Sequence, residues 1–349
     1  MLAIIVNKKD AEKVKKLLLK TNLLDDNRKI RRYNGNVEFP IKCKPNIKIG
    51  VNYKIIEQKN ENKNKNENEN ENIIFRKKFV PFEEIKKKLY GKISINDYKN
   101  LPKKWEKFGD VLVLKMKNIK SKKIVAETYA KILNCKTVLE DVGGISGIER
   151  KPNFKLLYGK DTETIHVENG IKYKFDVAKI MFSSGNIDER IRMSKIANKN
   201  EIVVDMFAGI GYFTLPIAVY SKAKVIACEI NPIAYEYLKE NILLNKVEKL
   251  VEVRLGDCRK VAPKKAADRI IMGYLDSIKF LSFAIEVLKN KGTIHLHQNC
   301  KEEEFPNKLI KKIKRIVEDK GKSVEILKYR KIKSYAPRIL HVVFDLFIS

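Results

Sequence analysis

The hydrophobic positions between residues 201 and 297 form short runs of apolar, largely β-branched residues, separated by segments that suit helices. The runs occupy residues 201–206, 224–229, 250–255, 268–273 and 292–297. Apolar runs of this length are typical of strands buried on both faces of a parallel sheet. Their regular alternation with helical segments predicts a doubly wound α/β sheet.

Two further runs follow, at residues 321–329 and 340–347. They predict two closing strands that form a hairpin and bring one antiparallel strand into the sheet.

The N-terminal part of the chain shows a shorter pattern of the same kind. Residues 2–6 predict a strand, and residues 10–19 a helix with Val14, Leu17 and Leu18 on one face. Residues 59–72 contain only Lys, Asn and Glu, so they lack the apolar surface that would offset the entropy of ordering. We therefore predict a small α/β domain at 1–58 and a low-complexity linker at 59–72.

Globular patterning resumes after the linker. A basic helix is expected around residues 82–89, a strand at 110–115 and a helix at 124–133, followed by short strands and turns. We assign a basic middle domain to residues 73–165 and the large sheet to a domain at 166–349. The aromatic side chains among the lysines of the middle domain suit either stacking on unpaired bases or a core, and the core is favoured: Phe79, Phe82, Tyr90, Tyr98 and Trp105.

A glycine turn follows the first strand of the predicted sheet. Gly209 and Gly211 allow a tight turn and let a ligand approach the backbone closely. The second strand ends at Glu229, about 20 residues later, which is the spacing at which a carboxylate accepts both hydroxyls of a ribose. Because no Lys-Ser/Thr pair follows the glycines, a phosphate-gripping loop is disfavoured. A turn in an α/β core that binds no ligand is the alternative.

The spacing of Asp205, Phe207, Gly209 and Gly211, with Glu229 after the second strand, resembles the class I S-adenosylmethionine-dependent transferases. The resemblance implies a Rossmann-like transferase sheet, preceded here by smaller α/β modules, and S-adenosyl-L-methionine as cofactor. Those five residues are then expected at the cofactor.

Two further segments suit the same cofactor. Ser183 and Arg190 flank a loop and a helix start just before the first strand, and a guanidinium grips an α-carboxylate through paired hydrogen bonds. Asp257 and Cys258 follow the third strand, where a side chain and a backbone amide can read an adenine edge. The alternatives are a solvated helix start for Arg190 and turn capping for Asp257.

The charge balance points to a polyanionic partner. Lys and Arg number 73 against 43 Asp and Glu, a formal net charge of +30, which favours nucleic acid. A biased genomic base composition explains abundant Lys, Asn and Ile, but it does not by itself produce such an excess of cations.

The cysteine and histidine positions argue against a metal centre. Five cysteines without a Cys-x-x-Cys pair support neither disulfides nor structural zinc and fit a reducing cytosol. His295 and His297 face the same side of one strand, but no third metal ligand is evident, so we expect no metal and place both in the core or facing substrate. The first six residues are too short for a signal peptide, and the apolar window at 201–220 carries two acids, so no membrane segment is expected.

Several motifs taken together identify relatives. These are Gly-Ile-Glu-Arg at 147–150, Thr-Glu-Thr-Ile-His at 162–166, Phe-Ser-Ser-Gly-Asn-Ile-Asp-Glu-Arg at 182–190, the glycine turn at 205–212 and Lys-Ser-Tyr-Ala-Pro at 333–337. Over residues 108–349 the chain is similar to the tRNA guanine-N1 methyltransferase and wybutosine-synthesising family. The Ser-x-Gly-Asn-Ile-x-Glu-Arg form, Met-Gly-Tyr after the fourth strand and His-x-His on the fifth resemble its aminocarboxypropyltransferase branch. Nitrogen methyltransferases usually have an Asn- or Pro-containing turn after the fourth strand, which is missing here.

The resemblance implies that the chain transfers the 3-amino-3-carboxypropyl group of S-adenosylmethionine to C7 of 4-demethylwyosine, next to the anticodon of tRNA(Phe). It further implies that cofactor contacts come from Ser183, Arg190, Glu229, Asp257 and Cys258, with Arg150 and Glu189 near the target base. Glu189 would remove the ring proton or stabilise charge, or would only orient Arg190. The N-terminal unit resembles the tRNA elbow-binding extension of the methyltransferase branch, and we expect a cytoplasmic monomer. The alternatives are a tRNA guanine-N1 methyltransferase, a non-catalytic tRNA-binding protein and a small-molecule methyltransferase.

Overall fold

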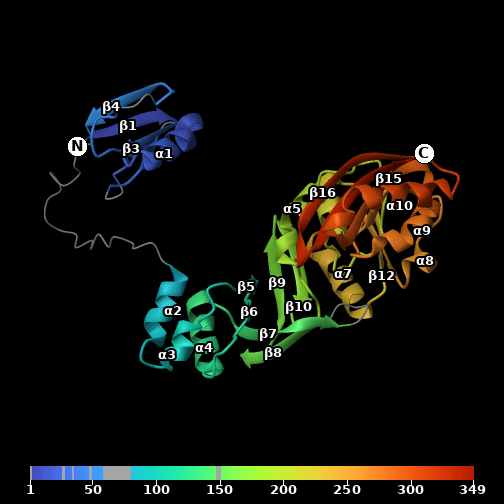
Figure 1. Cartoon of the computed structure of the whole chain (residues 1–349), viewed down its shortest axis with the longest axis horizontal. Coiled ribbons are helices and arrows are strands. Elements are labelled where there is room, and N and C mark those ends of the chain that lie inside the picture. Colours follow the sequence, from blue (N-terminus) through green and yellow to red (C-terminus); the bar gives the residue numbers. More distant parts are fainter. Residues whose placement is uncertain (1, 26–27, 34, 47–48, 58–79, 147–150) are drawn as a thin grey trace. The chain divides into compact units, whose positions relative to one another are not determined.

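The computed structural model describes residues 2–25, 28–33, 35–46, 49–57, 80–146 and 151–349 (Figure 1). The predicted linker at 59–72, Phe79 and the predicted Arg150 lie outside the described residues. The chain divides into two compact units, Met1–Arg76 and Lys77–Ser349. Among the described residues no helix is long and apolar enough to cross a membrane.

The first unit is a small α/β fold. Its four-stranded sheet has the order β2-β3-β1-β4 and is covered by helix α1, Ala11–Lys20. Val14 and Leu18 of α1 are fully buried against the sheet, and Leu17 is partly buried. The predicted strand and helix are confirmed. The strands are β1 (Leu2–Asn7), β2 (Arg31–Tyr33), β3 (Asn36–Pro40) and β4 (Tyr53–Glu57).

The second unit begins with a second small sheet, ordered β5-β6-β7-β8. Trp105 meets the buried Tyr129 ring edge to face, and Phe82 and Tyr98 pack on the same core, as expected for core aromatics. Tyr90 is the exception, because 77% of it is exposed. The elements are α2 (Pro81–Leu89), α3 (Ile95–Lys99), β5 (Glu106–Phe108), β6 (Val111–Leu114), α4 (Lys122–Leu133), β7 (Thr137–Ser146) and β8 (Lys151–Tyr158).

A two-stranded hairpin leads from the small sheet to the large one. Its strands are β9, Glu163–Glu168, and β10, Ile171–Asp176. Phe108 of the small sheet and Phe175 of β10 share one buried cluster with the large sheet. The predicted boundary at residue 165 therefore falls within β9, in a region where the two parts have a common core.

The large sheet has seven strands in the order β13-β12-β11-β14-β15-β17-β16. Strands β11 to β15 run parallel, and β17 is antiparallel to both β15 and β16, as the predicted closing hairpin requires. The chain moves outward from β11 to β13 and returns to β14 on the other side of β11. A crevice outside the carboxyl ends of the strands is expected at such a switch in strand order. The strands are β11 (Ile202–Asp205), β12 (Lys224–Glu229), β13 (Val251–Leu255), β14 (Ala267–Met272), β15 (Leu288–Lys301), β16 (Val324–Ala336) and β17 (Ile339–Ile348).

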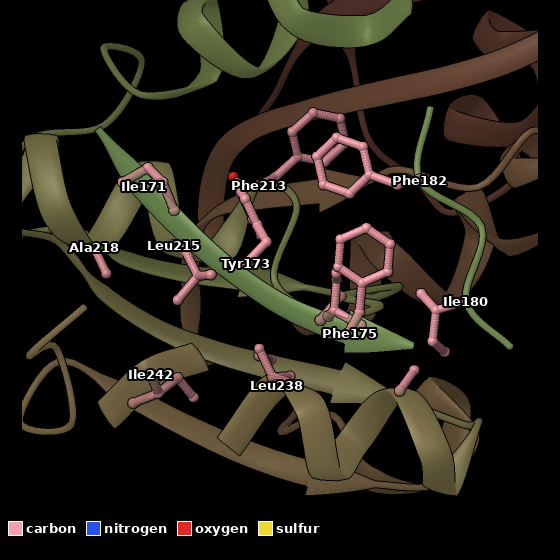
Figure 2. Close-up of a cluster of buried hydrophobic side chains, with 14 of the residues drawn as sticks. Ile171, Tyr173, Phe175, Ile180, Phe182, Phe213, Leu215, Ala218, Leu238 and Ile242 are labelled. Carbon is pink, nitrogen blue, oxygen red and sulfur yellow. The ribbon is translucent and has the colours of Figure 1, made fainter. Parts of the chain in front are cut away.

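Apolar clusters cover both faces of this sheet. Val203 belongs to one cluster and its neighbour Val204 to the other, because successive side chains of a strand point to opposite faces. Phe175, Phe182 and Leu238 fill the first cluster (Figure 2). The doubly wound α/β fold predicted from the sequence is thus confirmed. The helices of this part are α5 (Ile187–Met193), α6 (Thr214–Pro216), α7 (Pro232–Leu244), α8 (Cys258–Val261), α9 (Leu281–Val287) and α10 (Asn307–Glu318).

Candidate active site

A cavity of about 530 Å³ lies at the carboxyl ends of the parallel strands. Its size is that of a pocket for a small molecule or cofactor. One part of its wall comes from the segments that follow β11, β12, β13 and β14. The other part comes from the loop before α5 and from β15, β16 and β17. Seven predicted cofactor-binding residues line it: Ser183, Arg190, Phe207, Gly209, Glu229, Asp257 and Cys258.

The glycine turn and Glu229 are fixed to each other. The Gly209 amide donates to one carboxylate oxygen of Glu229 at 2.6 Å, and the Asn231 amide donates to the other at 2.8 Å. Gly209 has a φ of +57°, and a Cβ there would lie 2.5 Å from the Tyr212 ring. The carboxylate is thus held in the wall of the cavity, where its remaining lone pairs can accept ligand hydroxyls.

Asp205 and Gly211 do not line the cavity and instead shape the turn. Asp205 is fully buried and accepts hydrogen bonds from the Thr214 hydroxyl at 2.8 Å and the Phe207 amide at 3.3 Å. Burial raises the pKa of its carboxyl to about 6. Gly211 has a φ of +101°, and a Cβ would lie 2.7 Å from the Leu215 side chain. Their expected contact with the cofactor stays a prediction.

The sequence left two roles open for Asp257, recognition of the adenine edge and capping of a turn. In the structure its side chain caps a helix and also lines the cavity. Asp257 caps α8 by accepting from the Arg259 amide at 2.9 Å and also lines the cavity. Its ion pair with the Arg259 guanidinium lowers its pKa, so the carboxyl is ionised. Burial raises the pKa of Cys258 to about 12, which keeps it a thiol and makes it a poor nucleophile.

An aromatic wall lies near this segment. The Phe207 ring meets Phe280 edge to face, with centroids 5.0 Å apart, and lies 5.4 Å from Tyr274. All three rings line the cavity. A planar apolar wall beside the ionised Asp257 suits a heterocyclic base with an amino group. The sequence analysis did not assign Phe280.

Arg190 lines the cavity, but its paired donors do not point to an open site. Its Nε and Nη2 donate to the two oxygens of Glu168 at 2.5 and 2.7 Å, and Nη2 also donates to the Ser183 carbonyl at 3.0 Å. The guanidinium lies 4.7 Å over the Phe182 ring. Glu168 engages two of the guanidinium nitrogens, and the expectation that Arg190 grips the cofactor carboxylate stays a prediction. Glu168 was missed, and nothing in its sequence context marks it.

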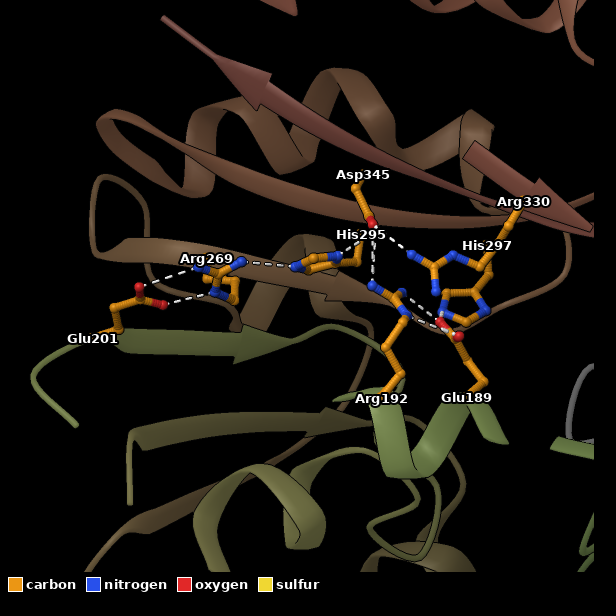
Figure 3. A network of polar contacts seen from close by, with 8 residues as sticks. All are labelled: Glu189, Arg192, Glu201, Arg269, His295, His297, Arg330 and Asp345. Atoms are coloured by element: carbon orange, nitrogen blue, oxygen red, sulfur yellow. Dashed lines mark hydrogen bonds and ion pairs between the residues drawn. The ribbon is translucent and has the colours of Figure 1, made fainter. Parts of the chain in front are cut away.

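Glu189 belongs to a buried network of alternating charges behind the cavity (Figure 3). Its carboxylate pairs with Arg192 at 2.5 and 2.9 Å, so the residue it orients is Arg192 and not Arg190. Glu189 is not among the residues that line the cavity. The network joins α5 to β14, β15, β16, β17 and the residue before β11, and its members are Glu189, Arg192, Asp345, Arg330, His295, Arg269 and Glu201.

The two histidines predicted on one strand have different surroundings. His295 lies inside the network, with Nδ1 2.6 Å from Asp345, whereas His297 lines the cavity. His297 Nδ1 is 3.2 Å from Nε2 of His341, a cavity residue that the sequence analysis missed, and its Nε2 is 3.6 Å from Glu189. Burial lowers the pKa of His297 well below its ordinary value, so the ring is neutral. In the described part of the chain, no group of three or more His, Cys, Asp or Glu side chains is placed to hold a metal.

Comparison with known proteins places this site in a family. The profile described as "TRM5/TYW2 methyltransferase domain" matches residues 164–327, and "TYW2 N-terminal domain" matches residues 85–162. The tRNA(Phe) (4-demethylwyosine(37)-C(7)) aminocarboxypropyltransferase of Pyrococcus horikoshii is 50% identical over 71% of this chain and 90% of its own length. The chain belongs to the TRM5/TYW2 family.

Solved structures of TRM5/TYW2 proteins agree with this assignment. P. horikoshii TYW2 in complex with MeSAdo has a TM-score of 0.70 and 45% identity, over 77% of this chain and 99% of that chain. M. jannaschii TYW2 in complex with AdoMet has a TM-score of 0.59 and 44% identity, over 70% of this chain and 99% of that chain. Both are family members crystallised with the cofactor or a derivative of it.

The methyltransferase side of the TRM5/TYW2 family matches the whole chain at lower identity. The tRNA (guanine(37)-N(1))-methyltransferase Trm5b of Pyrococcus abyssi is 33% identical over 100% of this chain and 99% of its own length. Its crystal structure has a TM-score of 0.65 and 32% identity, over 100% of this chain and 99% of that chain. The profile "tRNA methyltransferase 5 N-terminal domain" matches residues 3–49. The chain thus combines a Trm5-type N-terminal unit with TYW2-type middle and catalytic regions.

Proposed function

We propose that this protein transfers the 3-amino-3-carboxypropyl group of S-adenosylmethionine to C7 of 4-demethylwyosine in tRNA(Phe) and releases methylthioadenosine. The observation that carries the proposal is the 50% identity, over 90% of its length, to an enzyme named for that reaction. A preorganised cavity at the switch in strand order supports it from this chain's own residues.

The residues of the cavity fit the cofactor. Glu229 presents a fixed carboxylate for the ribose hydroxyls, and Phe207 and Phe280 form an apolar wall for the adenine beside Asp257. Ser183 and the neighbouring wall residues remain for the methionine portion. When bound, S-adenosylmethionine supplies an electrophilic carbon next to a positively charged sulfur, and the carbon that faces the base decides which group is transferred.

The segment after β14 supports carbon attack rather than nitrogen methylation. Met272-Gly273-Tyr274 contains neither Asn nor Pro, so it offers no side-chain amide oxygen to a ring nitrogen. A Cβ at Gly273 would lie 2.9 Å from the Phe213 ring, so the turn packs closely against that ring.

Proton removal from the base remains a predicted role of Glu189. Because Glu189 lies behind the wall and the neutral His297 lies in it, the carboxylate would act through that imidazole. Arg150, the second residue predicted near the base, lies outside the described residues, and its role also stays a prediction.

The decisive experiment uses cofactor labelled separately in the methyl and carboxyl groups. With tRNA that carries 4-demethylwyosine, carboxyl label should enter the tRNA and methylthioadenosine should appear in equal amount. Transfer of methyl label alone, with release of S-adenosylhomocysteine, would establish the methyltransferase alternative that the similarity to Trm5b suggests. Arg190→Ala should impair transfer more than Arg190→Lys, since lysine retains the charge opposite Glu168 but loses the paired geometry.

The partner is tRNA, as the relatives' names and the excess of cations indicate. That the anticodon loop of tRNA(Phe) enters the cavity, and that the enzyme acts as a cytoplasmic monomer, are parts of the proposal. Calorimetric binding of S-adenosylmethionine separates this enzyme from a non-catalytic tRNA-binding protein. Activity that persists at high salt on a small substrate would favour the small-molecule methyltransferase instead.

A further inference from the structure

Helix α10, Asn307–Glu318, carries an excess of positive charge on the surface of the large sheet. It contains five cations and one acid, and all five cations are exposed. Within the part of the chain that the structure describes, none of the five forms an ion pair or a side-chain hydrogen bond. Other helices neutralise their lysines internally, as Lys131 of α4 does with Glu127 and Lys239 of α7 does with Glu236.

Four of the cations form a stripe along one side of α10. They recur at spacings of three and four residues, which places them on one face of the helix. The opposite face is buried in the core of the large sheet through Leu309, Ile313 and Val317. Because its apolar face is used inside the protein, α10 is not available to insert into a lipid surface as a free amphipathic helix does. The cationic stripe consists of Lys308, Lys311, Lys312 and Arg315.

The cationic stripe works against the stability of the helix. Lys308 and Lys312 are like charges four residues apart, as are Lys311 and Arg315, and such pairs destabilise a helix. Lys308 also lies in the first turn, where the helix dipole disfavours a cation. A general bias toward lysine does not explain the arrangement, because α7, on the other face of the same sheet, has two acids and one lysine. An anionic partner outside the chain would offset the repulsion.

The cationic stripe begins at the edge of the sheet that holds the cavity. β15 reaches this edge at His297, which lines the cavity, and α10 starts soon afterwards. The strand that follows α10 begins at the opposite edge, where Val324 of β16 and Gly292 of β15 both pair with Ile348. α10 therefore runs from the cavity edge back across the sheet.

Strand β16 connects the cavity wall to the side of the sheet that α10 covers. Its half-exposed Tyr329 packs on Phe305, just before α10, with ring centroids 5.6 Å apart. Lys331 is exposed two residues further along, before the next register shift, so it lies on the same side as Tyr329. The strand then enters the cavity wall, where the Lys333 ammonium donates to the Ser183 hydroxyl oxygen at 2.7 Å.

We propose that the cationic stripe of α10, continued by Lys331 of β16, binds the phosphate backbone of tRNA outside the cavity. This inference rests on the proposed function and extends it to a part of the tRNA other than the target base. Exposed cations without carboxylate partners bind phosphates by charge and carry no sequence information. The stripe rises about 10 Å along the helix axis, which corresponds to about three steps of a duplex strand.

The test measures binding of a tRNA(Phe) transcript to the full-length protein at several salt concentrations. Lys311→Gln with Arg315→Gln removes two charges of the stripe and keeps good helix formers, and neither residue lines the cavity. This variant should bind the transcript about 3- to 30-fold more weakly, as for the loss of two exposed charge contacts. The slope of log affinity against log salt should fall by about 2. Calorimetric affinity for S-adenosylmethionine should stay within about twofold of the wild type.

Two further variants control for folding and net charge. Lys311→Arg with Arg315→Lys keeps both charges and should bind the transcript as the wild type does. Lys246→Gln with Lys249→Gln removes two exposed lysines from the loop after α7, on the other face of the sheet, and should leave the affinity within about twofold and the salt slope unchanged.

Two results would overturn the inference. One is wild-type affinity and salt slope in the α10 variant, even if that variant loses binding to polyglutamate, which would indicate an acidic protein as the partner. The other is an equal loss in the α7-loop variant, because net charge alone would then explain the effect. Neither result bears on the proposed function, which the labelled cofactor tests separately.

Discussion

Replacing Asp205 by Asn should stabilise the protein at neutral and alkaline pH. The Asp205 carboxyl is fully buried behind the glycine turn, and burial raises its pKa from 3.8 to about 6. A carboxyl whose pKa is higher in the folded state opposes folding once it ionises. Its favourable contribution is complete below pH 3.8 and is lost as the pH rises through about 6. Asparagine has the same shape and no charge to bury.

The magnitude follows from the shift. A rise from 3.8 to about 6 corresponds to about 3 kcal/mol, at about 1.36 kcal/mol per pH unit. Asn can still accept from the Phe207 amide, but the Thr214 hydroxyl loses its carboxylate acceptor, which costs about 1 kcal/mol. We therefore expect Asp205→Asn to be more stable than the wild type by about 2 kcal/mol at pH 8, and less stable by about 1 kcal/mol at pH 4.

Urea unfolding monitored by fluorescence gives the measurement. Trp105 is the sole tryptophan and lies in the same unit as Asp205, packed against Tyr129. The difference in unfolding free energy between the two proteins, taken from pH 4 to 8, cancels the titration of all groups they share. The argument that the ionised Asp205 carboxylate destabilises the folded protein would be refuted by either of two results. One is a difference in unfolding free energy that does not change with pH, and the other is a variant less stable than the wild type at pH 8.

Three other predictions address the turn and the N-terminal unit. Glu229→Ala should weaken S-adenosylmethionine and methylthioadenosine alike by about 1–3 kcal/mol, because both carry the ribose; unchanged calorimetric affinities would remove Glu229 from the site. Gly211→Ala should lower the unfolding free energy by about 1–3 kcal/mol, since its Cβ would lie 2.7 Å from Leu215. Gly321→Ala, which also has positive φ but nothing within 4 Å of a Cβ, is the control and should cost less in the same urea titration. Deleting residues 1–72 should leave cofactor affinity intact while raising the KM for tRNA and flattening its salt dependence; an unchanged KM would show that this unit does not contact tRNA.

The parts of the site that follow the parallel strands could be predicted from the sequence. Buried parallel strands are marked by continuous apolar runs, and their carboxyl ends meet at one edge of the sheet. Glu229 ends such a strand, and Gly209 and Asp257 lie in the loops that follow two others, so their convergence on one cavity was deducible without knowledge of the pairing partners.

The cavity residues that do not lie at the ends of parallel strands could not be predicted from the apolar runs of the sequence. The pairing of Arg190 with Glu168 depends on where the β9–β10 hairpin packs, which periodicity does not encode. Lys333 reaches Ser183 only because β16 pairs with β17 in a register shifted at three places, and such irregularities leave no signal in the alternation of residues. The motif that contains Lys333 identified the family without revealing what the lysine contacts.

The charge network behind the cavity constrains how the sequence can change. Glu189, Arg192 and Asp345 neutralise one another in succession, and all three are largely buried. Removing Arg192 leaves Glu189 as an uncompensated interior charge, at a cost of about 3–5 kcal/mol, whereas replacing Glu189 and Arg192 together by apolar groups of similar volume is nearly neutral. Arg192 therefore tolerates substitution better when Glu189 changes with it than when Arg192 changes alone. A library that varies Arg192 alone should find fewer tolerated changes than one that varies Glu189 and Arg192 together.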